Sequence, residues 1–414
     1  MGDFLGVASH LPRTLGDNFM RKFELDKLEA AGVTHLRKTF RWEHMEPEPD
    51  AYYFDEYNLV LDECAAHGID VMVGFRGKPA WATTDGTHDT LDTQQWAEFL
   101  GVFTQEVASR VTRYEIWNEA NLKVFWNPEP NPAKYGELLK AAFEAIHEKD
   151  DDAIVLLGGL SPFQFNERGV WGFLNDLYNA HPDVCDYFDA LSIHPYTFLQ
   201  RLTPEDGFDV MIYFHPGVEG MVEEARTILA TMGCPDKPIH LTEIGWPDLE
   251  IGQASQAAYM ARSLILAIGA GAASWYWYTF WDGEITPDTT IPTEERFGWF
   301  TWPNDETTQG KPSYDVLSTF GHTLAGYRYA GDLGKALEWP EGAFARVLRN
   351  EEGSWVVGLW RDVGEETLEE SQSFEVPLHP DAEGEWFLYD QGWLLMDSGS
   401  VALAPLTVQL SGEV

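Results

Sequence analysis

The chain has 414 residues, a length that suits two or three ordinary domains, or an α/β barrel of about 250 residues with a smaller domain. Hydrophobic residues make up 44% of it, so we expect a large buried core rather than wholesale disorder. The 27 lysines and arginines stand against 68 aspartates and glutamates, a formal net charge of −41. Nucleic acids and anionic membranes need a positive protein surface, so this balance excludes them as partners. The acidity fits a high-salt habitat and a merely soluble surface equally well.

The cysteines and the apolar runs place limits on redox chemistry and targeting. Cys64, Cys185 and Cys234 allow at most one disulfide, and no Cys-x-x-Cys spacing suggests a metal site. The N-terminal segment lacks the basic region and long apolar stretch of a secretion signal, so we expect a cytoplasmic protein as written, or a secreted one if a leader was trimmed. The longest uncharged run, Ser263–Trp281, approaches the length of a membrane span. We interpret it instead as a helix end, a break at Gly269–Gly271 and a buried aromatic strand.

Short apolar runs alternate with helical periodicities through the first three quarters of the chain. The runs predict eight strands: Phe4–Ser9, Val33–Thr39, Ile69–Phe75, Arg113–Asn118, Ala153–Gly159, Phe188–Ile193, Pro238–Glu243 and Ala273–Phe280. The helices are predicted at Asn18–Ala31, Asp55–His67, Thr93–Ser109, from Pro132 onward, and at Trp171–Ala180, Glu219–Met232, Ala254–Gly269 and Pro312–Leu324. Eight strand–helix repeats predict a parallel sheet closed into a (β/α)8 TIM barrel. An open doubly wound sheet is the alternative, but it usually carries a glycine-rich loop after its first strand, which this sequence lacks.

The pattern changes near residue 325, where strands and turns replace the strand–helix alternation. We therefore predict a catalytic barrel over residues 1–325 and a small antiparallel β-sandwich-like domain over residues 326–414. Asn350–Gly353 is a hairpin turn between the first two of its strands. These strands are predicted at Phe344–Arg349, Trp355–Trp360, Phe374–Leu378, Glu385–Tyr389 and Leu406–Leu410.

Two glutamates follow predicted barrel strands, where the active residues of such barrels emerge. The fourth strand ends in RYEIWNEAN, which places Asn118 and Glu119 at the rim, and the seventh ends in PIHLTEIGWP, which places Glu243 there. Two carboxylates aimed at one mouth are the minimum equipment for cleaving a glycosidic bond. Since neighbouring carboxylates resist double ionisation, we expect a protonated Glu119 beside an ionised Glu243. Taken singly, a strand-end glutamate is more often a solvated surface residue, and only the pair makes the catalytic interpretation strong.

These motifs resemble clan A, a large superfamily of glycoside hydrolases. Within it the chain is most similar to family 39, which includes β-xylosidases, α-L-iduronidases and bacterial exopolysaccharide hydrolases. The stretches that carry the resemblance are YEIWNEANLKVFW, LSIHPYT, HLTEIGWP and LRKTFRWEHMEPEPDAYYFDEYNLVLDECAAHGIDVMVGF. The resemblance spans most of residues 1–325 as an order of motifs, and families 5, 30, 51 and 53 share much of it. A barrel followed by a small β-domain also fits family 39.

The resemblance implies roles for five polar residues and a retaining mechanism. Glu119 would be the acid/base and Glu243 the nucleophile, with the two carboxyl groups about 5–5.5 Å apart. Asn118 would hydrogen-bond the sugar hydroxyl beside the reacting carbon. His194 and Tyr196 match the clan's His-x-Tyr positions, where the tyrosine orients the nucleophile.

Arg37 matches the clan's buried arginine, which would lower the pKa of the nucleophile. Each helper also has a structural interpretation. His194 could be a core histidine, Tyr196 a packing residue, and Arg37 could pair with a structural carboxylate such as Glu43.

Aromatic residues near the strand ends suit a carbohydrate cleft, because ring faces stack on the apolar C–H faces of sugars, although they suit an ordinary core equally well. By resemblance Trp281 would be the floor on which the sugar stacks, with Trp277 as the nearby rival. Further rim aromatics are Trp42, Phe75, Trp81, Trp126 and Trp246, of which we place Trp42 and Trp246 among the substrate-binding residues.

We expect no cofactor and no metal, because no metalloprotease, P-loop or EF-hand pattern is present. A transglycosidase, a non-catalytic carbohydrate-binding barrel and a lyase or aldolase using Lys78 remain alternatives. Residues 197–217 and 282–305 are expected to build the cleft walls, and Arg201 and Arg296 within them would permit an acidic sugar. The sequence carries no signal for sugar identity, for endo or exo action, or for an oligomeric state.

Overall fold

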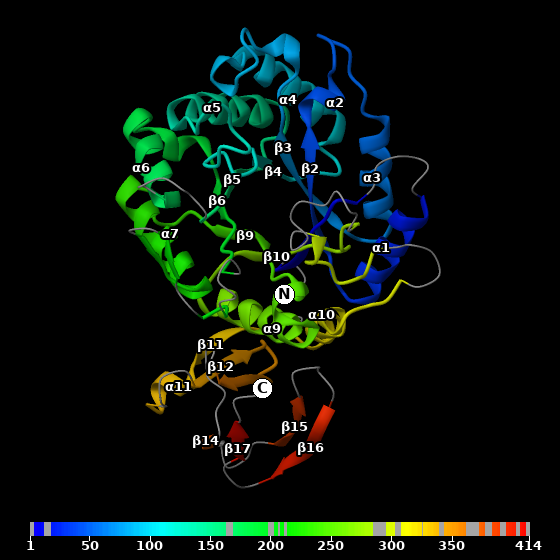
Figure 1. Ribbon diagram of the computed structural model, residues 1–414, viewed down its shortest axis with the longest axis vertical. Helices are drawn as coiled ribbons and strands as arrows, with labels where there is room; N and C mark the ends of the chain where they lie inside the picture. The colour runs from blue at the N-terminus through cyan, green and yellow to red at the C-terminus, as the bar shows by residue number, and fades with distance from the viewer. Residues whose placement is uncertain are drawn as a thin grey trace.

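Eight parallel strands close into a barrel in the order β1-β10-β9-β6-β5-β4-β3-β2, so the predicted TIM barrel is confirmed (Figure 1). The computed structural model describes residues 4–11, 18–162, 169–197, 203–205, 208–210, 213–284, 295–302, 308–324, 326–338, 343–361, 372–376, 383–389, 395–402 and 406–410. The barrel strands are β1 (Leu5–Ala8), β2 (His35–Arg41), β3 (Asp70–Arg76), β4 (Arg113–Ile116), β5 (Ile154–Leu160), β6 (Ala190–Ile193), β9 (Ile239–Ile244) and β10 (Ser274–Tyr278). Each overlaps one of the eight predicted strands.

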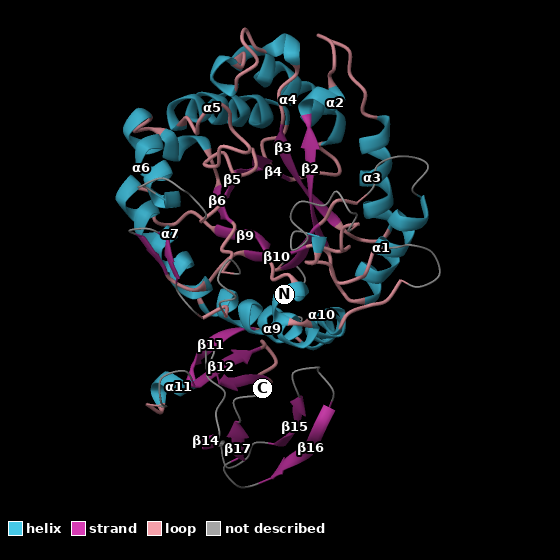
Figure 2. Cartoon of the chain, in the orientation of Figure 1, coloured by secondary structure: helices cyan, strands magenta, loops and turns pink. Residues whose placement is uncertain are grey.

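Helices surround the barrel and cover its outer face (Figure 2). The long ones are α1 (Asn18–Ala30), α3 (Asp55–Ala66), α4 (Thr93–Val107), α5 (Pro132–Lys149), α6 (Gly169–Ala180), α7 (Val218–Met232), α9 (Gln253–Gly269) and α10 (Pro312–Thr323). Short turns of helix were not predicted: α2 (Trp42–Met45), η2 (Ala80–Ala82), η3 (His88–Thr90), η4 (Val184–Tyr187), α8 (Asp248–Ile251) and α11 (Leu333–Ala336).

Local sequence explains where several helices begin and end. The side chain of Asp92 caps α4 by accepting hydrogen bonds from the backbone N–H groups of Gln94 and Gln95. Asn131 caps α5, whose first residue is Pro132. Helix α7 stops at Gly233, which has the left-handed φ of 94° that favours glycine.

The uncharged run Ser263–Trp281 lies inside the barrel domain. Its first part completes α9, a turn follows, and β10 continues as a buried strand, as the glycine break predicts. Within the described part of the chain, no helix combines the length and apolar character that crossing a membrane requires.

The barrel interior holds both apolar and buried charged side chains. Alternation along the strands separates a large core beneath the helices from a small cluster inside the barrel. That inner cluster holds Met72, Leu156 and Tyr276. Arg37 is paired in register with Met72, and Glu115 with Leu156, and both charged side chains are almost fully buried. Buried charges therefore lie beside the apolar cluster in the barrel interior.

Antiparallel strands follow the barrel, as predicted, and the first sheet that they form lies beside α9 (Figure 1). Strands β11 (Arg328–Asp332), β12 (Ala343–Arg349) and β13 (Trp355–Arg361) form one sheet, while β14 (Gln372–Val376) pairs with β17 (Leu406–Leu410) and β15 (Glu383–Tyr389) with β16 (Leu395–Ala402). The sequence pattern missed β11 and β16. It also missed the hairpin β7 (Phe208–Val210) and β8 (Tyr213–His215) in the segment after β6.

Trp360 packs on Ile265 and Leu266 of α9, and Arg346 pairs with Glu219 of α7 at 2.9 Å. These contacts join the three-stranded sheet to the barrel. The domain boundary at residue 325 stays a prediction.

One disulfide joins Cys185 of η4 to Cys234, which follows α7, and Cys64 is free and buried. The single bridge agrees with the upper limit that three cysteines set.

Candidate active site

The polar residues predicted at the ends of different strands meet at one mouth of the barrel. Glu119 follows β4, His194 follows β6, and Glu243 lies near the end of β9. One carboxylate oxygen of each glutamate and a ring nitrogen of His194 all lie within 4.8 Å of one another. The side chains of Glu119 and Glu243 are 11% and 14% exposed, so both remain accessible to solvent.

Glu119 is held by an unusual backbone at the end of β4. Trp117 and Glu119 have positive φ angles of 77° and 47°, a region that non-glycine residues seldom adopt and that often marks functional sites. The N–H of Glu119 donates to the carbonyl of Gly159 at 2.9 Å. A Cβ atom on Gly158 would collide with the carbonyls of Ile116 and Trp117, so glycine there lets β5 approach this turn. The strained turn aims the Glu119 side chain across the mouth.

Arg37 and Tyr196 hold the two oxygens of Glu243. Arg37 donates from Nη1 to Oε1 at 2.5 Å, and the Tyr196 hydroxyl donates to Oε2 at 2.9 Å. Burial by itself raises the pKa of Glu243, but the charges of His194 and Arg37 and the hydrogen bond from Tyr196 outweigh it, so that pKa lies below its usual value. Glu243 is therefore an ionised carboxylate at neutral pH.

Arg37 has a second carboxylate partner that sequence reasoning missed. Its Nε donates to Glu115 at 2.7 Å, its Nη2 also contacts Glu115, and Nη2 donates to Oδ1 of Asn118 at 2.8 Å. Ser192 supplies a further hydrogen bond to Glu115 at 2.8 Å. The sequence did contain a signal for Glu115, because a charged residue within an otherwise buried strand indicates a buried partner of opposite charge.

Arg37 does pair with a structural carboxylate, as its structural interpretation allows, but that carboxylate is Glu115 and not the suggested Glu43. Glu43 bonds Arg41 at 2.6 Å instead. Strand alternation explains the difference, because Arg37 points into the barrel toward β4 and β9, whereas Glu43 lies beyond the end of β2 in α2.

His194 links the two catalytic candidates. Its Nδ1 lies 2.9 Å from Glu119 and 3.6 Å from Glu243, and the side chain is fully buried. Burial lowers the pKa of His194, but the charge of Glu243 and the hydrogen bond to Glu119 raise it above the usual value overall. Beside Nε2 lies Gly159, where a Cβ atom would collide with the ring. The histidine is thus both a core residue and a part of the site.

The predicted sugar-stacking tryptophans are placed differently from expectation. Trp42, Trp246 and Trp277 have no exposed area, so none of them presents a ring face to a ligand. Trp281 is 8% exposed and packs among Phe23, Phe280 and Phe300.

The structure gives no support to the substrate-binding roles of Trp42 and Trp246. The reason is that aromatic rings beside a barrel rim also fill the space between strands and helices, and the sequence does not separate the two uses. The sugar-stacking role of Trp281 stays a prediction, and only a small part of this side chain is exposed to a ligand.

Other predicted residues have structural partners. Arg296 forms a bidentate ion pair with Asp248 at 2.8 and 3.0 Å, and Lys78 donates to the carbonyl of Gly86. Arg201 lies outside the described residues, as do parts of both predicted cleft walls. Arg296 is thus already paired with a carboxylate and gives no support to an acidic substrate, and the expectation for Arg201 stays a prediction.

Within the described ranges, Glu119, His194 and Glu243 are also the one group of three that could present ligand atoms to a metal ion. The contacting oxygens of both glutamates and Nδ1 of His194 already have hydrogen-bond partners in the protein. The arrangement is therefore suited to proton transfer and nucleophilic attack by the side chains themselves.

A family model described as cellulase, glycosyl hydrolase family 5, matches residues 10–283 of this chain. Similar solved structures include a family 39 glycoside hydrolase from the gut symbiont Bacteroides cellulosilyticus WH2, with 22% identity, a TM-score of 0.76, and coverage of 100% of this chain and 79% of that one. A monomeric β-xylosidase from Caulobacter crescentus CB15 has 15% identity, a TM-score of 0.64, and coverage of 99% and 93%.

At these identities the structural neighbours establish the fold, and the family model establishes the family. The expected resemblance to clan A glycoside hydrolases is confirmed, and family 39 enzymes are among the neighbours. The chain belongs to the cellulase family, glycosyl hydrolase family 5, and is a glycosidase that acts on a carbohydrate substrate.

Proposed function

We propose that the protein hydrolyses β-type glycosidic bonds in an oligo- or polysaccharide with retention of configuration. The observation that carries the proposal is the short separation of Glu119 and Glu243, which have an oxygen each within 4.8 Å of the other. Carboxyl groups about 5–5.5 Å apart suit a covalent intermediate, whereas about 6.5–9.5 Å leaves room for the water of an inverting enzyme. The close pair supports the retaining alternative.

In the first step Glu243 attacks the anomeric carbon. A bond forms between its carboxylate oxygen and that carbon as the bond to the leaving oxygen breaks, and Glu119 donates its proton to the leaving oxygen. Arg37 and Tyr196 keep Glu243 ionised and oriented for this attack. The product of the step is a glycosyl ester of Glu243.

In the second step water releases the sugar. Glu119, now a carboxylate, removes a proton from water, the water oxygen attacks the anomeric carbon, and the ester bond to Glu243 breaks. His194 contacts Glu119 through both steps and fixes the position of its carboxylate. The amide of Asn118, whose oxygen accepts from Arg37, is left to donate from its nitrogen to the neighbouring sugar hydroxyl.

The proposal is tested with a panel of nitrophenyl β-glycosides and polysaccharides. Glu243→Ala should lower kcat by about 10³-fold or more while the melting temperature stays near that of the parent. Glu119→Ala should retain the first step on a dinitrophenyl glycoside, whose leaving group needs little protonation, and mass spectrometry should detect the accumulated glycosyl-enzyme. Glu129→Ala is the matched control, since Glu129 is an exposed surface glutamate.

Product analysis distinguishes the remaining alternatives. Proton NMR of the first-formed sugar should show the β-anomer, and an initial α-anomer would contradict retention. Transfer of the sugar to an added alcohol in preference to water would identify a transglycosidase. If the protein binds a polysaccharide of the panel but turns over none of the panel's substrates, it is a non-catalytic carbohydrate-binding barrel.

A further inference from the structure

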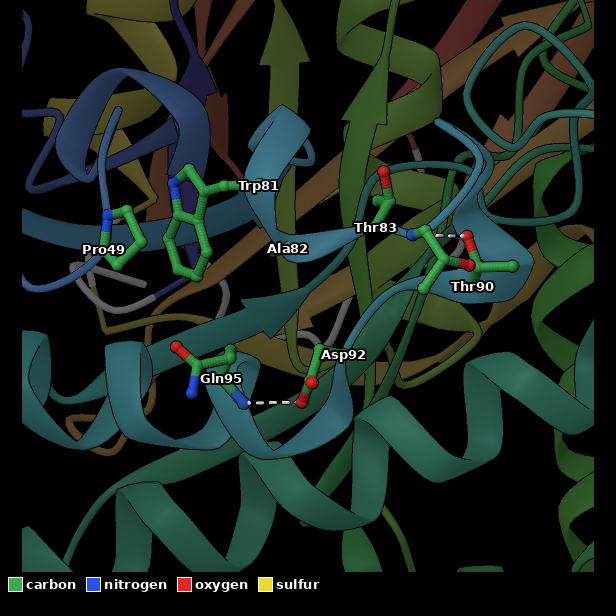
Figure 3. A pocket seen from close by; sticks show the side chains of 8 residues that line it. Pro49, Trp81, Ala82, Thr83, Thr90, Asp92 and Gln95 are labelled. Carbon is green, nitrogen blue, oxygen red and sulfur yellow. Dashed lines mark hydrogen bonds between the residues drawn. The ribbon is translucent and has the colours of Figure 1, made fainter.

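A cavity lies among the loops after β2 and β3, and its lining includes none of the catalytic candidates. Its volume is about 380 Å³, and its lining includes Pro49, Trp81, Thr84, Asp92 and Gln95. Figure 3 shows the Trp81 and Pro49 side chains on one side, Gln95 of α4 below them, and the threonines beyond. None of the residues that bind Glu119 or Glu243 contributes to this cavity, which we call the Trp81 groove.

Trp81 is fixed as a rigid aromatic surface. Its indole N–H donates to the carbonyl of Glu46 at 3.1 Å, and its ring packs edge to face with the fully buried Trp42 at 5.6 Å. The side chain of Glu46 in turn accepts hydrogen bonds from Trp42 and from the N–H of Asp50. Trp81 itself remains partly exposed. The ring is thus held in place from behind and is open toward the groove.

The polar side chains of Asp92 and Gln95 line the same groove as this ring. Asp92 caps α4 through one carboxylate oxygen, and within the described chain its second oxygen makes no hydrogen bond to protein. The Gln95 amide nitrogen donates to Glu98, which leaves the amide oxygen of Gln95 as an acceptor. An aromatic face that shares a groove with a carboxylate and an amide is a combination suited to a sugar ring, since the apolar C–H face stacks on the indole and hydroxyls donate to the oxygens.

The Trp81 groove lies at the same end of the barrel as the catalytic glutamates, because both are formed by segments that follow strand carboxyl ends. The loop after β3 is also joined to the loop after β4. His88 packs against Trp117 and Trp126, each at 5.2 Å, and its Nδ1 accepts from the N–H of Asn127 at 2.7 Å. The groove is therefore held rigidly beside the segment that carries Glu119.

We propose that the Trp81 groove is an auxiliary carbohydrate-binding site that holds a residue of a neutral polysaccharide outside the catalytic centre. Neutral sugars are favoured because Asp92 is the charged residue of the lining and the whole chain carries −41. The proposal rests on the glycosidase activity and narrows its substrate to a chain long enough to occupy both places. Substrates of one sugar should not use the groove.

The test compares polymer binding with turnover of a small glycoside. Affinity gel electrophoresis would use hydroxyethylcellulose, β-1,4-xylan and β-1,4-mannan as separate probes. At least one should retard the parent protein, and Trp81→Ala should weaken that retardation about tenfold while kcat/KM on a nitrophenyl glycoside stays within about twofold. Trp81→Phe should restore part of the binding. Gln95→Ala, a change at a partly exposed helix position, should weaken it about threefold.

Tyr53→Ala is the matched control. Tyr53 lies in the segment that follows β2, as Pro49 does, and is 62% exposed, but it does not line the groove. The proposal is overturned if none of the three polymers retards the parent, or if Trp81→Ala and Gln95→Ala bind polymer as the parent does. Equal loss of polymer binding and of nitrophenyl turnover in a folded Trp81→Ala protein would also overturn it. Failure of the retaining mechanism itself would appear in the Glu243 and Glu119 variants, independently of these results.

Discussion

Arg37 on β2 reaches across the barrel mouth and donates a 2.5 Å hydrogen bond to Glu243 on β9. The two residues are 206 positions apart in the chain, and the same guanidinium also binds Glu115 on β4. The nucleophile candidate therefore shares its cation with a buried structural carboxylate. This arrangement couples the stability of the barrel to the ionisation of Glu243.

Replacing Arg37 tests its role in stabilising the barrel through Glu115 and its role in keeping Glu243 ionised. Arg37→Met leaves Glu115 and Glu243 without their cation, and we expect the free energy of unfolding to fall by about 3–5 kcal/mol, as when one partner of a buried ion pair is removed. Urea denaturation measures this loss. The double variant Arg37→Met/Glu115→Gln should recover much of the stability but none of the activity. A single variant as stable as the parent would contradict the buried-pair description.

Tyr196→Phe removes the hydrogen bond to Oε2 of Glu243 and leaves the ring in place. That bond lowers the pKa of Glu243, so its loss raises that pKa and moves the acidic limb of the kcat/KM profile to higher pH. Hydrogen bonds to charged groups contribute about 1.5–3 kcal/mol, so kcat/KM should fall about 10- to 100-fold.

The pH–rate profile with a nitrophenyl glycoside is the measurement for Tyr196→Phe. Tyr314→Phe is its control, because the Tyr314 hydroxyl binds the carbonyl of Lys27, away from the site. An unshifted acidic limb would remove Tyr196 from the control of Glu243.

Glu24 predicts a pH dependence of stability. It is completely buried on α1 and hydrogen-bonded by Ser9, and burial raises its pKa to about 7. The folded state holds the proton of Glu24 more tightly than the unfolded chain does. The contribution of this carboxyl group to the free energy of unfolding is therefore largest below its ordinary pKa and is lost as pH rises through about 7. The loss is roughly 3 kcal/mol at most. Urea unfolding measures the effect at pH 4.5 and at pH 8. The free energy of unfolding of the parent should fall between these two pH values by more than that of Glu24→Gln. An equal fall in the two proteins would contradict this prediction.

The disulfide between Cys185 and Cys234 closes a segment with a sequence separation of 49 residues. Removing it in Cys185→Ser/Cys234→Ser should lower the free energy of unfolding by about 2–4 kcal/mol through the larger freedom of the unfolded chain. Thermal unfolding with and without a reductant checks this. The reductant should lower the melting temperature of the parent and leave that of the variant unchanged.

The sequence by itself determined the order of the barrel strands and long helices, and it singled out Glu119 and Glu243 as the catalytic candidates. Hydrophobic alternation and helical periodicity are local properties, so the eight barrel strands and helices such as α5 could be predicted within windows of a few turns. The motifs around Glu119 and Glu243 likewise lie within a few residues of each strand end. Short turns such as α2 and the β7–β8 hairpin escaped prediction because they are too brief to show a period.

Only the tertiary structure decided which side chains meet. The pairing of Arg37 with Glu115 depends on barrel closure and on strand register, which place residues 78 positions apart within hydrogen-bond distance. The burial of Trp42 and Trp246 and the exposure of Trp81 were decided in the same way. An aromatic ring has the same local pattern in a core and in a binding groove, and the packing of distant helices determines which of the two it joins.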